Sequence, residues 1–212
     1  MNELYPVYII LFSNNTSFAK MIRKMTKQNY SHATISTDTT LNNMYSFSDI
    51  PFNHNRFTGA GFVRESIWSP MYSTNRYFTV LVTFTDKKGI DTINNKIESF
   101  KRDYLKQKYN DFGLIKYYLN FKDTKDRDEH KKQKWFCSEF VTYMLKSGKI
   151  EGFEDILQSP QDLKTTRPNV ISLGDFTIRE FKESDLIRKT ERAKIQFITI
   201  PKMYRFNHIF AY

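Results

Sequence analysis

The sequence predicts an α+β protein in which strands come first, helices follow, and short strands return at the end. Residues 6–86 contain runs rich in β-branched and aromatic residues, which favour strands. Residues 91–147 contain apolar residues at helical spacing. The tail 169–212 alternates apolar and polar residues in short runs. No regular strand–helix alternation is present, so a parallel βαβ sheet is not expected.

The N-terminal part carries several strand patterns. PVYIILFS is an apolar run that ends at Asn14 and Asn15, which is typical of a buried strand. YSHATISTD alternates, so Tyr30 and His32 fall on one side of a strand. RYFTVLVTFTD has the strongest strand pattern in the chain. We expect strands over residues 6–13, 30–38, 43–48, 61–67 and 76–86.

Helical spacing appears in several places. WFCSEFVTYML repeats apolar residues on one helical face and is closed by Gly148. In SPQDL, Ser159 is placed as an N-cap with Pro160 at the first helical position. We expect helices from Thr16 or Ser17, from Asp91, over 111–121, over 136–147 and from Ser159.

Two further segments bear on the domain organisation. The charged run 122–134 is interpreted as a solvated connection. A weakly marked boundary near residue 168 divides the chain into a main domain, 1–168, and a strand-rich C-terminal extension or interaction arm, 169–212. Within this extension, KIQFITI (194–200) is expected to be a strand or part of such an arm.

Composition limits the partners and the setting. The chain has 212 residues, 40% of them hydrophobic, which is enough for a packed core. Its net charge of +10 favours anionic partners. The lysines are interleaved with acidic residues, so specific nucleic-acid binding is not expected. We expect no signal peptide and no transmembrane segment, because the apolar run 7–12 is too short to span a bilayer. A cytoplasmic or virion-associated location fits these expectations.

The chain contains one cysteine, so an internal disulfide is excluded. Cys137 falls at the first turn of the helix 136–147, where the positive end of the helix stabilises a thiolate. His32, on a strand, is a candidate base for this thiol. A cysteine between aromatic residues also fits a small buried hydrophobe, and a histidine in a strand is often structural. One cysteine and four dispersed histidines give no zinc-ligand spacing, so neither metal nor cofactor is expected.

Five segments carry a resemblance to a known family. NYSHATIS, NMYSFSD, GAGFVRESI, WFCSEFV and SPQDL, in this order, resemble the circularly permuted branch of the NlpC/P60 papain-like superfamily, the YiiX-like hydrolases. In that branch the histidine strand precedes the cysteine helix. The resemblance covers roughly residues 6–165. It implies a permuted papain-like fold, an antiparallel sheet packed against helices, with His32 and Cys137 as the catalytic pair.

The resemblance also implies a third polar residue, commonly a glutamate, that orients the histidine from the next strand. By register this position falls on or beside Ser46, which offers a hydroxyl but no negative charge. Glu65 in GFVRESI could instead supply the carboxylate, although it also fits a surface strand residue. Glu139 is interpreted as a surface or capping group. Tyr30 could line a cleft, donate to an oxyanion or simply pack.

These residues lead to one leading function and two rivals. The resemblance implies a cysteine hydrolase that cleaves an amide in a peptide, a wall polymer such as peptidoglycan or a lipid-linked substrate, and relatives act on lipid acyl groups. The first rival is a weak or inactive papain-like module with a structural role, possible in a virus particle. It draws on the missing acidic residue at Ser46 and on the aromatic tail 194–212, which could bind a protein partner. The second rival is a nucleic-acid-binding protein, which predicts steeply salt-dependent binding.

Overall fold

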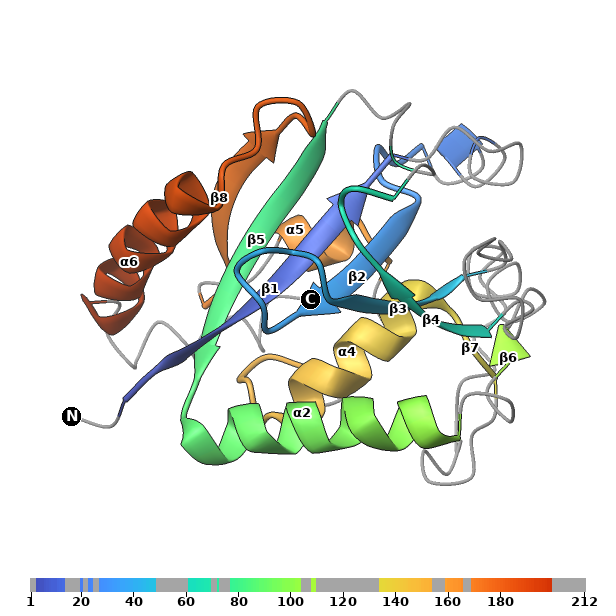
Figure 1. The fold of residues 1–212 in the computed structure, drawn as a ribbon, viewed down its shortest axis with the longest axis horizontal. Coiled ribbons are helices and arrows are strands. Elements are labelled where there is room, and N and C mark those ends of the chain that lie inside the picture. The colour runs from blue at the N-terminus through green and yellow to red at the C-terminus, as the bar shows by residue number, and fades with distance from the viewer. Residues whose placement is uncertain are drawn as a thin grey trace, which may run out of the picture.

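In the described part of the chain, eight strands form one sheet in the order β7-β6-β4-β3-β2-β1-β5-β8 (Figure 1). Neighbouring strands are antiparallel except for the short parallel pair of β6 and β7. The strands are β1 (Tyr5–Phe12), β2 (His32–Ser36), β3 (Met44–Ser48), β4 (Gly61–Glu65), β5 (Phe78–Thr85), β6 (Lys108–Tyr109), β7 (Lys134–Trp135) and β8 (Ile171–Phe176). The helices are α2 (Lys87–Arg102), α4 (Cys137–Ser147), α5 (Asp162–Thr165) and α6 (Glu183–Thr199).

The coordinates come from a computed structural model, which describes residues 3–13, 20, 23–24, 27–48, 61–69, 72, 77–103, 108–109, 134–153, 159–165 and 169–199. The helix expected near Thr16 or Ser17, the helix expected over 111–121 and the charged run 122–133 lie outside these residues. None of the helices in the described ranges is both long enough and apolar enough to cross a membrane.

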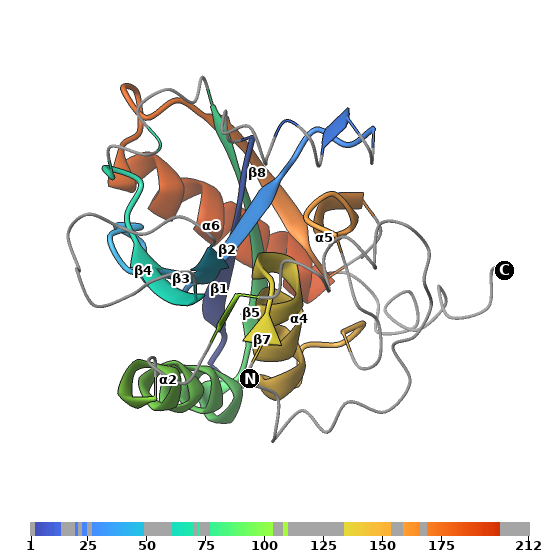
Figure 2. The same ribbon diagram turned by 90° about the vertical axis from the view of Figure 1, so that its right-hand side faces the viewer.

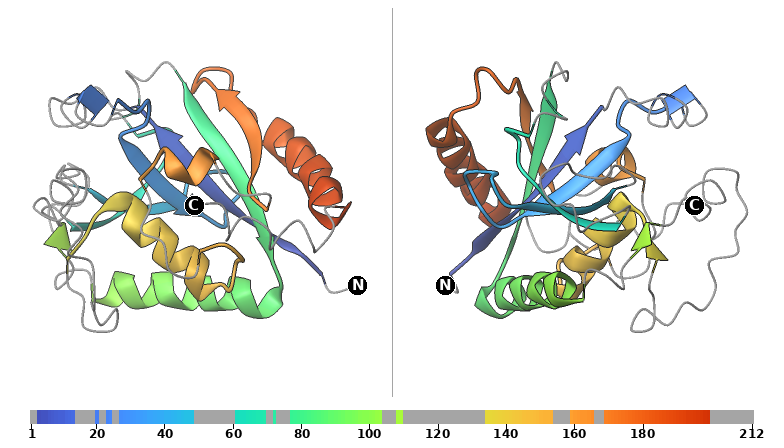
Figure 3. Two further views of the ribbon diagram at one scale, coloured as in Figure 1. Left: turned by 180° about the vertical axis from the view of Figure 1, so that it is seen from behind. Right: turned by 45° about the vertical axis from the view of Figure 1, so that its right-hand side comes forward.

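Helices cover both faces of the sheet, which explains why β1 is apolar throughout. Side chains alternate along a strand, so Val7, Ile9 and Leu11 join the core beneath α2 and α4. Tyr8, Ile10 and Phe12 join the core beneath α6 on the other face. Figures 2 and 3 show the sheet between these two helical layers. The expected α+β class and the antiparallel character of most of the sheet are confirmed.

The five expected strands all form, with ends within about two residues of the predicted ones. The helix expected from Asp91 begins earlier, at Lys87, which corrects that boundary. The cause is Asp86, whose side chain accepts a hydrogen bond from Gly89 N at 2.8 Å and caps the helix. Gly89 itself is needed, because a Cβ there would lie 2.6 Å from the Gly148 carbonyl oxygen. The start of α2 and the end of α4 therefore pack closely.

The strand expected over 194–200 is wrong, because residues 194–199 belong to α6. The alternation in KIQFITI is a weaker signal than the longer helical repeat that contains it. The buried residues of α6, Leu186, Thr190, Ala193 and Phe197, recur every three to four positions. Phe197 packs against Phe84 of β5 with ring centroids 5.1 Å apart.

The described part of the C-terminal segment shares the sheet and the core with the rest of the chain. β8 pairs with β5 along the edge of the sheet. α6 covers β5 and β8, and its buried residues belong to the same cluster as Tyr8 and Ile10. Residues 171–199 are thus an integral layer of the fold rather than a free arm. Residues 200–212 lie outside the described part.

Candidate active site

Cys137 is the first residue of α4, and only Phe136 separates it from β7. The backbone N–H of Phe136, the N-cap, donates to Glu139 Oε2 at 3.4 Å. Glu139 therefore caps the helix, which is one of the two roles expected for it from the sequence. Glu139 is only 7% exposed and is not a surface group. Backbone N–H groups in the first turn of a helix have no acceptor within the helix, so they are available to an anion beside Cys137.

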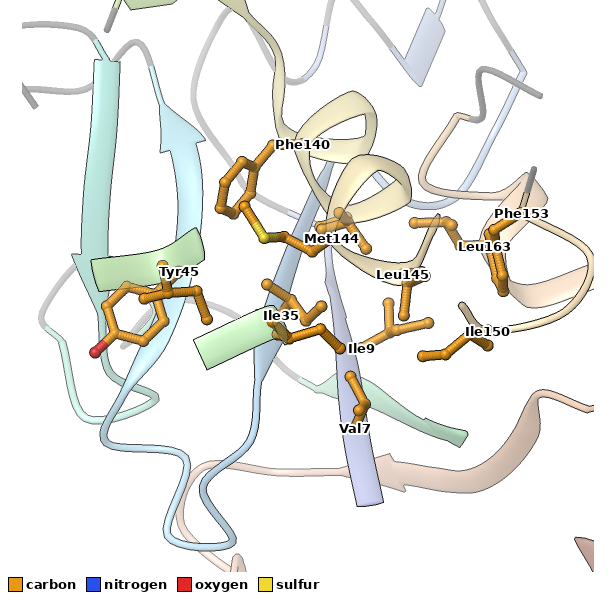
Figure 4. Packing of buried hydrophobic residues seen from close by; sticks show 14 of the residues in the cluster. Val7, Ile9, Ile35, Tyr45, Phe140, Met144, Leu145, Ile150, Phe153 and Leu163 are labelled. Atoms are coloured by element: carbon orange, nitrogen blue, oxygen red, sulfur yellow. The ribbon is translucent and has the colours of Figure 1, made fainter. Parts of the chain in front are cut away.

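Aromatic packing fixes α4 on the sheet and thereby fixes Cys137. The ring centroid of Phe140 lies 5.3 Å from that of Phe47 on β3 and 5.6 Å from that of Phe62 on β4. Phe100 of α2 completes the cluster at 5.2 Å from Phe140. Below Phe140, Met144 and Leu145 pack against β1 and β2 residues such as Ile9 (Figure 4). Such contacts hold a helix to within a fraction of an ångström.

His32 is the first residue of β2, where it pairs in register with Phe12 of β1. Its Nε2 lies 3.0 Å from Glu65 Oε1 and 3.1 Å from Oε2. The side chain of Cys137 also lies beside the imidazole, close enough to raise the pKa of His32. Because Nε2 faces the carboxylate, Nδ1 is the nitrogen left for the thiol. The ring is therefore held between an acid and a thiol.

Glu65 is the last residue of β4 and is 1% exposed. Its Oε2 also accepts a hydrogen bond from the hydroxyl of Tyr72. The Tyr72 ring stacks on Phe12, with centroids 3.9 Å apart and an interplanar angle of 11°. Burial and the adjacent Glu65 carboxylate raise the pKa of Tyr72 well above its ordinary value, so Tyr72 stays a proton donor. Two donors thus hold the buried carboxylate.

The electrostatic balance at His32 favours the imidazolium. Burial by itself would lower the pKa of His32. The charge of Glu65, the adjacent Cys137 side chain and the hydrogen bond to Glu65 together outweigh burial and raise the His32 pKa to about 10. At neutral pH the ring then carries a proton on both nitrogens. It is poised to stabilise a thiolate and later to act as an acid.

The structure brings together Cys137, His32 and Glu65, and it places Ser46 elsewhere. The Ser46 hydroxyl donates to the carbonyl oxygen of Ala33 at 2.8 Å, so it ties β3 to β2 rather than orienting the imidazole. Glu65 is buried and does not have the surface position that its sequence also allowed.

Tyr30 is occupied by other partners. Its hydroxyl lies 2.7 Å from Thr79 Oγ1 and accepts a hydrogen bond from Lys164 Nζ at 2.7 Å. The side chain is 4% exposed and belongs to the core beneath α4. The sequence allows three roles for Tyr30: lining a cleft, donating to an oxyanion, and packing. Its buried position fits the packing role.

Among the residues that the structure describes, Tyr72 contacts Glu65 although the sequence pattern did not point to it. It lies in SPMYSTN, where no strand or helix periodicity places it beside Glu65. A buried glutamate requires hydrogen-bond donors. A reader of the sequence would have looked for a donor such as Tyr72 only after concluding that Glu65 is buried.

The described residues contain no group of three or more His, Cys, Asp or Glu side chains able to hold a metal ion. A cavity of about 370 Å³ lies at the opposite end of α4 from Cys137, with Gly89, Ser147 and Gly148 among its lining residues. No protein-family model matches the sequence, and no curated protein is detectably similar to it.

Proposed function

We propose that this protein is a cysteine hydrolase that cleaves an amide with Cys137 as the nucleophile. The observation that carries the proposal is the position of His32, which contacts the Cys137 side chain on one side and Glu65 on the other. The three residues come from α4, β2 and β4. A nucleophile, a base and a group that orients the base are the recurring elements of acyl-transfer sites.

In the proposed reaction, the Cys137 thiolate attacks the amide carbonyl carbon and forms a tetrahedral oxyanion. Backbone N–H groups at the start of α4 donate to this oxygen. As the C–N bond breaks, the His32 imidazolium gives its proton to the departing amine and leaves a thioester on Cys137. A water molecule, deprotonated by the now neutral His32, then attacks the thioester carbonyl. The C–S bond breaks, which releases the acid and restores the Cys137 thiolate beside the His32 imidazolium.

The permuted papain-like fold is part of the same proposal. A cysteine at the start of a helix, a histidine at the start of a preceding strand and a mostly antiparallel sheet support it. Among the substrates that the resemblance implies, the net charge of +10 favours an anionic amide, such as an acidic peptide of a wall polymer or a lipid-linked amide.

One observation favours a second candidate, an inactive papain-like module with a structural role, for example in a virus particle. Cys137 is 2% exposed, His32 is 6% exposed and Glu65 is 1% exposed. A substrate carbonyl can reach the sulfur only if neighbouring groups move. In a structural module the same three residues would serve as a buried polar network.

Alkylation of the folded protein by iodoacetamide near neutral pH separates the two candidates. We expect Cys137 to react faster than a free thiol, and we expect His32→Ala to slow the reaction at least tenfold while Ser46→Ala leaves it unchanged. Hydrolysis of peptidoglycan stem peptides, with Cys137→Ser as the control, then identifies the bond cleaved. If Cys137 reacts only after denaturation, the proposal of a cysteine hydrolase is rejected and the proposal of a structural module remains.

A further inference from the structure

α6 exposes apolar side chains on its outer side. Among the described residues, five large hydrophobic side chains are exposed, and three of them lie on this helix: Ile187 at 44%, Ile195 at 66% and Ile198 at 49%. Figures 1 and 3 show α6 at one edge of the molecule, on the far side of the sheet from α2 and α4. A helix of one domain normally turns isoleucines inward, so this outer side has the character of an interface.

The three isoleucines lie on one stripe. At about 100° per residue, Ile198 lies roughly 20° and Ile195 roughly 80° around the helix from Ile187. By the same rotation, the buried residues Leu186 and Phe197 lie roughly 100° and 80° from Ile187 in the other direction, so the buried face adjoins the stripe on the side away from Ile195. α6 is therefore apolar on two faces, and only one of them is covered by its own sheet.

Two charged residues lie inside the stripe, between Ile187 and Ile198. Glu191 is exposed and Lys194 is half-buried. By the same rotation, Glu191 lies roughly 40° and Lys194 roughly 20° from Ile187, on either side of it. Any partner helix that covers the isoleucines must also meet one negative and one positive group at the middle of the contact.

We propose that α6 packs antiparallel against α6 of a second copy of this chain. We place Ile187 of one helix opposite Ile198 of the other. Two residues then face one another when their numbers add up to the sum of 187 and 198. Glu191 then faces Lys194 of the other copy, and the two-fold axis repeats this ion pair. The helix supplies both the apolar contact and its own complementary charges, so a second copy covers Ile187 and Ile198, places Ile195 at the edge of the contact and pairs Glu191 with Lys194.

Other arrangements of two α6 helices do not satisfy these charges. A parallel pair places Glu191 opposite Glu191 and Lys194 opposite Lys194. An antiparallel pair shifted to place Ile187 opposite Ile195 also sets Glu191 against itself and Arg188 against Lys194. Like charges at a contact are repulsive, so one register is selected.

The test measures the dimer dissociation constant of the full chain by sedimentation equilibrium at about 150 mM salt, where net charge is screened beyond about 8 Å. We expect the wild type to form a dimer and Ile195→Lys or Ile198→Lys to weaken it at least about tenfold, which corresponds to about 1.4 kcal/mol. Gln196→Lys is the matched control, because it adds the same side chain to the same helix about 180° from Ile187. Circular dichroism melting verifies that each variant folds.

Charge exchange tests the register. Glu191→Lys and Lys194→Glu each place like charges together twice, so each variant alone is expected to be monomeric at concentrations where the wild type is a dimer. Mixed together, they restore both ion pairs and are expected to form a heterodimer. The proposal is overturned if the wild type stays monomeric up to about 100 μM. This holds whether residues 200–212 or a different protein would then cover the stripe. A dimer that the isoleucine and charge variants leave intact overturns it as well.

Discussion

The carboxylate of Glu65, at the end of β4, lies 3.0 Å from Nε2 of His32, at the start of β2, and both side chains are buried. This contact joins residues from strands that are not neighbours in the sheet, since β3 lies between them. A buried carboxylate stabilises the charged form of a neighbouring imidazole, and Glu65 raises the pKa of His32 in this way. The predictions below follow from this pair and from its attachment to α4.

Replacing Glu65 by glutamine should lower the pKa of His32. The carboxylate is the charge that raises this pKa to about 10, and without it burial favours the neutral ring. We expect the His32 titration midpoint, followed by the ring nitrogen shifts in NMR, to fall from about 10 toward the ordinary value of 6.5. Ser46→Ala is the control, because its hydroxyl donates to the Ala33 carbonyl. A midpoint unchanged in Glu65→Gln contradicts the assignment of Glu65 as the partner.

The same pair makes stability depend on pH in a defined direction. The folded pKa of His32, about 10, lies above the ordinary value of 6.5, so the pair stabilises the folded state fully below pH 6.5. This contribution is lost as the pH rises through about 10. We expect the difference in free energy of unfolding between wild type and Glu65→Gln to shrink by on the order of 2 kcal/mol across that window. Urea unfolding at several pH values measures it, and a difference that grows with pH would show the opposite sign of linkage.

Tyr72→Phe should weaken the support of Glu65 without disturbing the aromatic packing. The variant keeps the ring that stacks on Phe12 but removes the hydroxyl that donates to Glu65 Oε2. Because a hydrogen bond to a charged acceptor is lost in a buried site, we expect a loss of about 1.5–3 kcal/mol in unfolding free energy. Tyr77→Phe is the matched control, since Tyr77 is 43% exposed. Equal stability of the two variants would mean that the Tyr72 hydroxyl does not support the carboxylate.

Phe140→Ala should destabilise the protein strongly, because Phe140 is the side chain through which α4 contacts β3, β4 and α2. We expect a loss of about 3–5 kcal/mol in unfolding free energy, typical of a buried aromatic truncation. Phe140→Leu, which leaves a smaller cavity, should lose less. Trp68→Ala, at a side chain that is 54% exposed, serves as the surface control. The idea that Phe140 fixes the helix fails if its truncation costs no more than that of Trp68.

The strands and the cysteine helix could be predicted from the sequence because their signals are local. The apolar run of β1 and the helical repeat after Cys137 each depend on residues close together in the chain. The helix start at Lys87 and the helical form of residues 194–199 were missed because they depend on a side-chain cap and on a longer repeat. In both cases a shorter pattern within the segment was the more visible one.

The orienting residue could not be chosen between Ser46 and Glu65 from the sequence. Strand register indicates which residues lie opposite one another, but a single pair, Ile35 and Tyr45, joins β2 and β3. How the hairpin of β3 and β4 lies across β2 therefore depends on packing against Phe140 and Phe100, which are far away in the chain. That packing brings the end of β4, and not Ser46, to the imidazole.

The sequence by itself determined the strands β1 to β5, the single thiol at a helix start and the pairing hypothesis of Cys137 with His32, because periodicity and motif order are properties of the chain. Only the tertiary structure decided that Glu65 and Tyr72 lie beside His32, that these side chains are buried, and that residues 171–199 form a layer of the same fold. Burial and through-space charge arise only when distant segments pack together, and the pKa of His32 depends on both.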